Sequence, residues 1–282
     1  MNDFVTEPLV STQWLADNLG RDDVKVVDGS FYLPAEQRDA GAEFLARHIP
    51  GAVFFDIDQV CDKSSELPHM FPTAAEFAAA VGALGIGNDD TVITYDGGKL
   101  TGACRVWWMF RAFGHARVAV LDGGIGKWLA EDQAVEAGAA APDPAPYEAR
   151  FAPDMLRDVT QMLSLIDSAG MQILDARSAG RFAGIAAEPR AGLRSGHMPG
   201  ARNLPYDQLL AEDGTLRPTD ELRARFVEAG IDLAAPVVTS CGSGVSAAVL
   251  LLALQRLGHR ENALYDGSWS EWGSRDDTPV VT

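Results

Sequence analysis

The sequence contains an internal repeat, and this repeat limits the possible folds more than any other feature of the chain. Four unlike motifs of the first half return in the second half in the same order, at nearly constant separations of 144 to 149 residues. The matched segments are 26–29 with 173–176, 48–52 with 197–201, 94–98 with 239–243, and 121–128 with 265–272. Because chance does not keep four motifs in register, we expect two domains of the same design.

Each half has the pattern of an α/β domain, in which short apolar segments alternate with longer helical ones. The segments of the first half that we expect to be strands are 25–28, 91–95 and 118–121, and the expected helices are 74–84 and 106–113. This alternation favours a mainly parallel sheet covered by helices, with functional sites at the carboxyl ends of the strands. At 282 residues the chain is long enough for two domains with cores of their own.

Segment 134–146 separates the two halves. It is rich in Ala, Gly and Pro and has no periodic apolar pattern, which is typical of an exposed connector. We therefore place the domain boundary near residue 145, so that the predicted domains are 1–145 and 146–282.

One loop of the second half has the properties of an anion-binding site with a thiol at its start. Segment 236–252 predicts a short buried strand, a glycine-rich loop that begins at Cys241, and an apolar helix. Gly242 and Gly244 allow backbone turns that point several N–H groups inward, and a helix that begins near Ser246 leaves its first amides unpaired. These donors would stabilise a thiolate on Cys241. The alternative is a buried cysteine in an ordinary strand-turn-helix unit, and the flanking glycines disfavour it.

The repeat is uneven at this loop. Asp96 occupies in the first half the place that Cys241 occupies in the second half. A carboxylate cannot act as a sulfur nucleophile, so we expect the first domain to be catalytically silent. It could still supply one wall of the site.

Charge and cysteine content exclude several classes of function. The formal net charge of −17 disfavours nucleic acid and anionic membrane surfaces as partners, because both require clustered Lys and Arg. Cys61, Cys104 and Cys241 are far apart and form no CxxC pair, so neither a disulfide framework nor a zinc site is expected. Cys61 and Cys104 are expected to be inert, unless exposure makes one of them sensitive to oxidation. No metal or organic cofactor is indicated, and the absence of an apolar leader or membrane span favours a cytoplasmic protein.

The motifs resemble those of a known family. The loop 241–247, the paired His-x-Pro-Gly-Ala motifs, the run 105–115 and the segment 267–272 are similar to motifs of the two-domain rhodanese-type sulfurtransferases. Within that family they are most like the 3-mercaptopyruvate sulfurtransferases, and the resemblance covers nearly the whole chain. It implies a tandem of two rhodanese-like domains in which Cys241 becomes a persulfide. Members of the family usually have Thr where this loop has Ser246.

The resemblance also implies a substrate site. The loop residues expected to contribute to it are Gly242, Gly244, Val245 and Ser246. Arg181 and Arg190 match the positions of the two arginines that hold substrate in 3-mercaptopyruvate sulfurtransferases, and guanidinium groups suit bidentate contacts with carboxylates. Without the resemblance, both arginines would be interpreted as solvated surface residues. Arg194 has no matched role and is expected to lie at the surface.

The resemblance further implies that the Ser243 hydroxyl works with a histidine and an aspartate of the first domain, here His69 and Asp58. In such a chain Asp58 orients the imidazole, His69 moves protons, and Ser243 relays them to the substrate. The family motif is less strict here, since Cys61 and Lys63 fall inside the segment. The alternative is that these residues only order the contact between the domains.

The residues that follow Cys241 favour one sulfur donor over another. Thiosulfate:cyanide sulfurtransferases of this fold typically have Arg and Lys around the loop, whereas Gly242 and Ser243 are uncharged, which resembles the mercaptopyruvate type. A neutral loop in an acidic protein also stabilises a doubly charged donor less well than a basic loop would. We therefore expect sulfur to pass from 3-mercaptopyruvate through Cys241 to an acceptor, with release of pyruvate. The acceptor would be a thiol, such as thioredoxin or a small thiol, or cyanide.

Other functions remain as alternatives. The first is a thiosulfate:cyanide sulfurtransferase, or rhodanese, and the second is a non-catalytic rhodanese-like binding module. The retained Cys241 disfavours the second. A cysteine-dependent phosphatase is disfavoured as well, because it needs an arginine six positions after the nucleophile, where this chain has Ala247.

Overall fold

The structure, a computed structural model, describes residues 7–168 and 170–282. Contacts between residues divide the chain into two compact units. Unit 1 consists of the described residues up to Asp62 together with Phe71–Ala152 and Ala211–Leu216. Unit 2 consists of Lys63–Met70, Pro153–Leu210 and Arg217–Thr282. Each unit therefore includes one short segment from the other half of the sequence.

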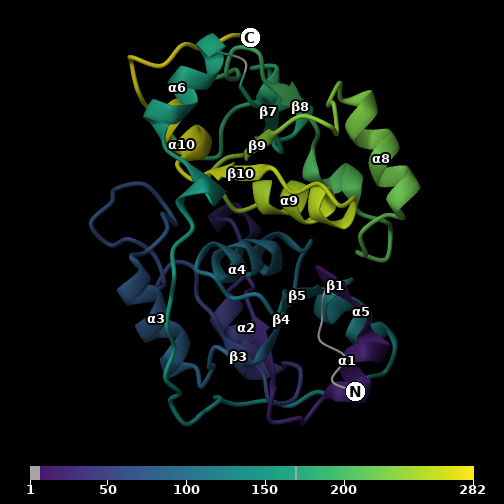
Figure 1. Ribbon diagram of the computed structural model, residues 1–282. Helices are drawn as coiled ribbons and strands as arrows, with labels where there is room; N and C mark the ends of the chain where they lie inside the picture. Colours follow the sequence, from purple (N-terminus) through teal and green to yellow (C-terminus); the bar gives the residue numbers. More distant parts are fainter. Residues whose placement is uncertain (1–6, 169) are drawn as a thin grey trace. The chain divides into compact units, whose positions relative to one another are not determined.

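Unit 1 is built on a five-stranded parallel sheet with the strand order β1-β5-β4-β2-β3 (Figure 1). Its strands are β1 Leu9–Val10, β2 Val24–Asp28, β3 Val53–Phe54, β4 Thr91–Tyr95 and β5 Val118–Leu121. Its helices are α1 Thr12–Asn18, α2 Ala40–Ala46, α3 Ala74–Ala83, α4 Thr101–Ala112 and α5 Gly124–Ala130, with the 3-10 turn η1 Pro34–Glu36. Strand β4 is central, so its carboxyl end lies between those of β2 and β5.

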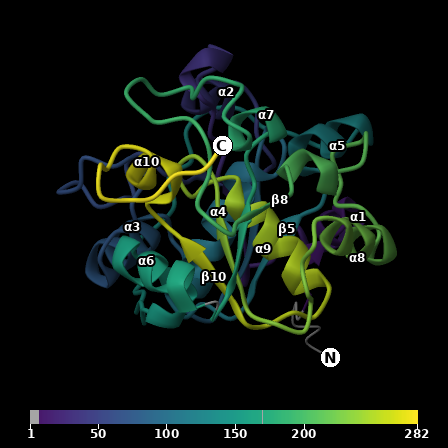
Figure 2. The ribbon, with the colours of Figure 1, turned by 90° about the horizontal axis from the view of Figure 1, so that it is seen from above.

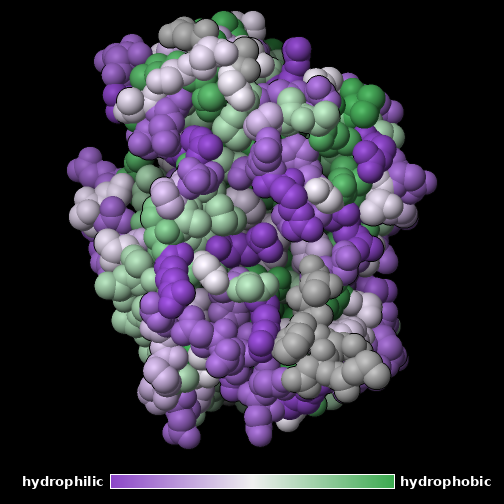
Figure 3. All heavy atoms as spheres, viewed as in Figure 1, coloured by the Kyte–Doolittle hydropathy of each residue, from purple (hydrophilic) through white to green (hydrophobic). Residues whose placement is uncertain are grey.

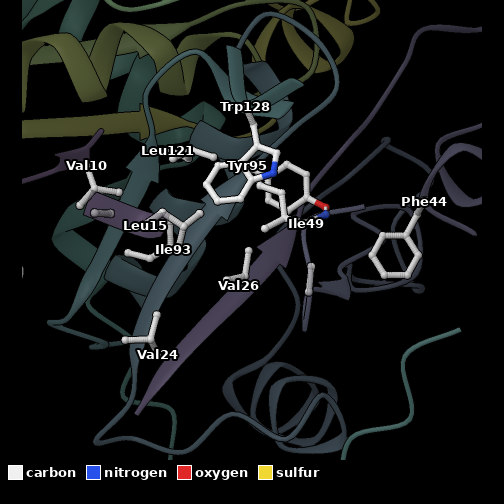
Figure 4. Packing of buried hydrophobic residues seen from close by; sticks show 12 residues of the cluster. Val10, Leu15, Val24, Val26, Phe44, Ile49, Ile93, Tyr95, Leu121 and Trp128 are labelled. Atoms are coloured by element: carbon white, nitrogen blue, oxygen red, sulfur yellow. Dashed lines mark hydrogen bonds between the residues drawn. The ribbon is translucent and has the colours of Figure 1, made fainter. Parts of the chain in front are cut away.

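Helices cover both faces of the unit 1 sheet. On one face, alternate side chains of β2, β4 and β5 pack against Leu15 of α1 and Trp128 of α5 (Figure 4). On the other face lies α4, whose Ala103 carbonyl accepts a hydrogen bond from the Thr94 hydroxyl of β4 at 3.0 Å. Because both faces are covered, every residue of β4 is buried, and the strand contains no charged residue.

Unit 2 repeats this architecture, with the strand order β6-β10-β9-β7-β8 and parallel pairing throughout. Its strands are β6 Leu156–Arg157, β7 Gln172–Asp175, β8 Arg202–Asn203, β9 Val237–Ser240 and β10 Asn262–Tyr265. Its helices are α6 Val159–Ser168, α7 Ala179–Phe182, α8 Thr219–Glu228, α9 Ala247–Arg256 and α10 Ser268–Trp272, with η2 Pro153–Met155 and η3 Tyr206–Leu209. Helix α9 packs on β9 and β10, and Figure 2 shows α9 beside β10 from a second direction.

The predicted repeat of two α/β domains is confirmed, because the two strand orders are the same when β6 to β10 are matched with β1 to β5. Strands β4 and β5 have the predicted bounds. Helix α4 differs, since it was expected over 106–113 and begins at Thr101. The reason lies outside the apolar pattern: the Asp96 carboxylate accepts the N–H groups of Gly102 and Ala103 and so stabilises an earlier first turn.

Hydrophilic side chains predominate on the face drawn in Figure 3, in keeping with a chain of which 22% of the residues are charged. Apolar residues on that face lie singly or in small groups, as is normal for a protein surface. Within residues 7–168 and 170–282, no helix combines the length and the apolar character needed to cross a membrane.

Candidate active site

Cys241 lies at the carboxyl end of β9, the central strand of unit 2. The loop that follows it ends at Ser246, the N-terminal cap residue of the ten-residue helix α9. Cys241 is 2% exposed, and Ser243 is also buried. Gly244 has a φ of +74°, a left-handed conformation that costs glycine least, so the loop can turn tightly. Cys241 therefore lies at the helix end where the first-turn amides lack partners within the helix, which favours negative charge.

The guanidinium of Arg181 lies against this loop. A Cβ atom placed on Gly242 would come within 3.1 Å of Arg181 Nη2, so the glycine leaves the space that the guanidinium occupies. Arg181 Nε donates to Glu188 Oε2 at 3.1 Å, and Nη2 donates to the same oxygen. A fifth of the Arg181 side chain is exposed. The cation predicted to bind the substrate is therefore beside the Cys241 loop, and it is already paired with an anion.

Glu188 connects Arg181 to a buried ion pair at the carboxyl end of β7. Glu188 Oε1 accepts from Arg177 Nη1 at 2.8 Å, and Arg177 Nε donates to Asp175 Oδ2 at 2.9 Å. The side chains of Asp175 and Arg177 are fully buried, and that of Glu188 is 2% exposed. Two carboxylates and two guanidinium groups alternate along this chain, so each buried charge has a partner of opposite sign.

Arg190 lies close to His69, although 121 positions separate them in the sequence. Arg190 Nη2 and His69 Nε2 are 3.4 Å apart. His69 is 6% exposed, has a φ of +59°, and belongs to the segment Lys63–Met70 of unit 2. The fold thus brings together two of the residues that the sequence singles out as candidates.

Asp58 belongs to unit 1, where its backbone N–H donates to Asp56 Oδ1 at 2.8 Å. Its carbonyl accepts from Cys61 Sγ at 3.2 Å. The chain that would link Asp58, His69 and Ser243 stays a prediction.

In unit 1 a carboxylate fills the loop that corresponds to the loop after β9. Asp96 is 2% exposed, and its Oδ1 accepts the N–H groups of Gly98 at 3.0 Å and Leu100 at 3.2 Å. Its Oδ2 accepts those of Gly102 at 3.0 Å and Ala103 at 3.2 Å. Burial raises the pKa of the Asp96 carboxyl, and the four N–H bonds oppose that rise. The first-half loop is therefore an anion cradle that its own side chain occupies.

The other two cysteines differ in their surroundings. Cys104 is fully buried in α4, and burial raises the pKa of its thiol well above the ordinary value, so it stays protonated at neutral pH. Cys61 is partly exposed and donates its S–H to a neighbouring carbonyl.

Arg194, expected at the surface, is partly exposed and also bonds to the C-terminal segment of unit 2. Its guanidinium donates to the carbonyls of Trp272 at 2.8 Å and Thr278 at 2.9 Å, and its own carbonyl accepts from Trp269 Nε1 at 2.9 Å. The sequence does not reveal these bonds, because the partners are mainly backbone groups about 80 positions away in the chain, and bonds to backbone groups leave no residue pattern in a sequence.

The structure adds residues to the site that do not follow from the sequence. They are Arg177 and Glu188, which support Arg181, and Ser268 and Ser270, which bond to the Cys241 loop. One signal was present for each pair: Glu188 falls between the two candidate arginines, and the serines belong to segment 267–272, which carries part of the family resemblance.

The site residues form no metal cluster, and an open hollow elsewhere on unit 2 does not include them. Among the residues that the structure describes, no group of three or more His, Cys, Asp or Glu side chains could hold a metal ion. An open hollow of about 540 Å³ on unit 2 is lined by Ser178, Ala179, Pro205, Asp207, Gln208, Arg217 and Arg225. It contains none of the predicted site residues.

Comparison with known proteins finds the same repeat and close relatives. The model of the rhodanese-like domain family matches residues 11–131 and again residues 158–275. The chain is 42% identical to "Thiosulfate/3-mercaptopyruvate sulfurtransferase 1, mitochondrial" of Arabidopsis thaliana, over 98% of this chain and 78% of the relative. It is 44% identical to the 3-mercaptopyruvate sulfurtransferase of Escherichia coli strain K12, over 96% of each chain.

A solved structure agrees with these matches. The crystal structure of SseA from Escherichia coli, described as having the rhodanese fold and the catalytic mechanism of 3-mercaptopyruvate sulfotransferases, matches with a TM-score of 0.86. The two chains are 42% identical, and the match covers 94% of this chain and 99% of the other.

Proposed function

The chain belongs to the rhodanese-like family of sulfurtransferases, and we propose that it transfers the sulfur of 3-mercaptopyruvate to a thiol or to cyanide through a persulfide on Cys241. The observation that carries this proposal is the position of Cys241, a buried thiol at the start of α9 with the Arg181 guanidinium against the next residue. A nucleophile and a ligand for an anionic donor thus meet at one loop.

In the first half-reaction the Cys241 thiolate attacks the sulfur of the donor. An S–S bond forms while the C–S bond of the donor breaks, and the electron pair of that bond passes to the carbon as the enolate of pyruvate. A proton then adds to the carbon and gives pyruvate, while the hydrogen of the donor thiol stays on the transferred sulfur. Arg181 and Arg190 bind the donor carboxylate and ketone, and the backbone of Gly242, Gly244, Val245 and Ser246 faces the developing negative charge.

In the second half-reaction the acceptor removes the outer sulfur of the persulfide. Attack by a thiolate gives the persulfide of the acceptor and restores the Cys241 thiolate, and attack by cyanide gives thiocyanate. With a dithiol, the second thiol displaces hydrogen sulfide and closes a disulfide. The two half-reactions share only the sulfur-loaded enzyme, so ping-pong kinetics are expected.

Proton transfer in this mechanism falls to Asp58, His69 and Ser243. Asp58 orients the imidazole of His69, and His69 exchanges protons with the Ser243 hydroxyl and the donor. Support comes from the 3.4 Å separation of His69 Nε2 and Arg190 Nη2, because Arg190 is itself a proposed ligand of the donor.

The main alternative is thiosulfate as the donor, and the name of the Arabidopsis relative includes both donors. The uncharged Gly242 and Ser243 favour mercaptopyruvate, since they add no positive charge for a dianion. Initial rates with each donor, using cyanide and a dithiol as acceptors, decide between them. A higher kcat/KM for thiosulfate would overturn the choice of donor, and turnover of neither would favour a binding module.

The covalent step has a direct test. Intact-protein and peptide mass spectrometry after addition of mercaptopyruvate without acceptor should show one added sulfur on Cys241. The Cys241→Ser variant should show none and should not turn over, whereas the control Cys61→Ser should behave like the unmodified protein. Added sulfur on another residue would refute the mechanism.

The acceptor and the cellular location are part of the same proposal. Thioredoxin, a small thiol and cyanide all fit the second half-reaction, and turnover with each ranks them. The three cysteines are free thiols, which accords with a reducing compartment such as the cytoplasm. Fractionation of cells that express the tagged protein tests the location.

A further inference from the structure

The start of α10 forms hydrogen bonds with the backbone of Cys241 and Gly242. The N–H of Cys241 donates to Ser268 Oγ at 3.2 Å, and the Cys241 carbonyl accepts from the N–H of Trp269 at 3.0 Å. The Gly242 carbonyl accepts from the N–H of Ser270 at 2.8 Å and from its Oγ at 2.7 Å. Both serines are buried, with exposures of 0% and 5%. We call these four bonds the α10 clamp.

Ser268 occupies a conformation that does not suit serine. Its φ is +49°, in the left-handed region where only glycine is free of strain from a Cβ atom. Its hydroxyl donates to the Tyr265 carbonyl at 2.8 Å, so the oxygen lone pairs are turned toward the N–H of Cys241. A glycine would relieve the strain but would lose both bonds. Strain kept at a site next to the nucleophile points to a function for the hydroxyl.

The silent half of the chain provides an internal comparison. Gly124 and Gly126 occupy the positions of Ser268 and Ser270 in the repeat of 121–128 with 265–272. Of the contacts that form the α10 clamp, the first half has the backbone bond from the Ile125 N–H to the Asp96 carbonyl, at 3.1 Å. A Cβ on Gly124 would come within 2.5 Å of that carbonyl, so a serine does not fit there. The two serine hydroxyls are therefore found in the half whose loop carries the Cys241 thiol, and glycines take their places in the half whose loop carries Asp96.

We propose that Ser268 and Ser270 are positioning residues that fix the Cys241 sulfur for attack on the donor. The inference rests on the proposed persulfide mechanism. With its N–H bonded to Ser268, Cys241 does not contribute its own amide to the anion cradle, and the direction of its Cα–Cβ bond is set. The rate of a positioned nucleophile falls steeply when its geometry relaxes, so loss of the clamp should slow sulfur transfer more than it weakens donor binding.

The decisive variants are Ser268→Gly and Ser270→Ala. Each should lower the single-turnover rate of persulfide formation at saturating mercaptopyruvate by about 10- to 100-fold, with KM changed by about twofold at most. Ser268→Gly should change the thermal midpoint little, because relief of the positive-φ strain offsets the loss of the two hydrogen bonds. Ser270→Thr retains the hydroxyl and should restore most of the rate. The control is Ser274→Ala, since Ser274 is exposed and its hydroxyl bonds to the Glu271 carbonyl at 2.9 Å, away from the Cys241 loop.

A second readout needs no sulfur donor. The pH profile of Cys241 alkylation by iodoacetamide, followed by site-resolved mass spectrometry, should move to higher pH in both variants, because a loosened loop stabilises the thiolate less well. Wild-type rates and an unmoved profile in Ser268→Gly and Ser270→Ala would overturn the inference, as would rate losses that only parallel losses of stability. If the unmodified protein formed no persulfide, the proposed function would fail, and the alkylation profile would still decide for or against the clamp.

Discussion

Arg181 and Glu188 meet through a single oxygen: the Nε and Nη2 groups of Arg181 both donate to Glu188 Oε2, while Oε1 accepts from Arg177. Glu188 is buried and Arg181 is partly exposed, so the charge of the carboxylate reduces the positive potential that the guanidinium offers to a donor in solution. Such a site disfavours a second negative charge on the donor.

Replacing Glu188 by Gln should therefore change donor preference. The ratio of kcat/KM for thiosulfate to kcat/KM for mercaptopyruvate should rise about tenfold. The reason is that a more positive site stabilises thiosulfate, a dianion, more than it stabilises mercaptopyruvate, whose carboxylate carries one negative charge. The control is Glu228→Gln, which removes the carboxylate of an exposed pair with Arg225 in the same unit. An unchanged ratio in a folded Glu188→Gln protein would contradict the explanation.

Replacing Arg190 by Ala should weaken the handling of the donor. Loss of a charge-assisted bond to the carboxylate should lower kcat/KM for mercaptopyruvate by about 10- to 100-fold. Steady-state rates measure the change, and Arg225→Ala serves as a control at an exposed arginine. If kcat/KM is unaltered, Arg190 is not a ligand of the donor.

Replacing Asp96 by Ala should destabilise unit 1 and leave the chemistry in place. Four N–H groups would lose their acceptor, and we expect a cost of about 2–4 kcal/mol in the free energy of unfolding. Urea unfolding gives the change, with Asp89→Ala as a control at an exposed carboxylate. The persulfide on Cys241 should still form, and its absence from a folded variant would give Asp96 a role beyond stabilising its own loop.

Asp28 should make stability fall as pH rises from about 4 to 7. Burial raises the pKa of Asp28 to about 6, against an ordinary value of 3.8. Between these two pKa values the folded state holds a proton that the unfolded state has released, so the free energy of unfolding falls by about 2–3 kcal/mol as the pH rises through this range. The neutral Asp28→Asn variant avoids this cost.

The measurement is the difference in unfolding free energy between Asp28→Asn and the unmodified protein at several pH values. Between pH 4 and pH 7 this difference should change by about 2–3 kcal/mol in favour of Asp28→Asn, and it should then stay constant to pH 8. Parallel curves over the whole range would show that the Asp28 pKa is not raised.

The features that depend on local order can be predicted from the residues alone. The register of four motifs predicts two similar domains, and alternating apolar segments predict the parallel sheets, because strands and helices have their own periods. The exchange of Cys241 for Asp96 is likewise visible in the residues alone. The start of α4 was missed, because a side chain in the preceding loop caps it.

Which side chains meet depends on the folded chain and is known from the structure. It placed His69 beside Arg190, and it set two serines of α10 against the Cys241 loop. It also shows that both halves place an Arg–Glu pair against the second residue of the loop, Arg38 with Glu43 at Gly97 and Arg181 with Glu188 at Gly242.

These two pairs are five and seven positions apart and do not align in the repeat. Long side chains can reach one point in space from different backbone positions, and bonds to backbone groups are made without regard to residue type. For both reasons such contacts leave no regular trace in a sequence, and they exist only once the chain has folded.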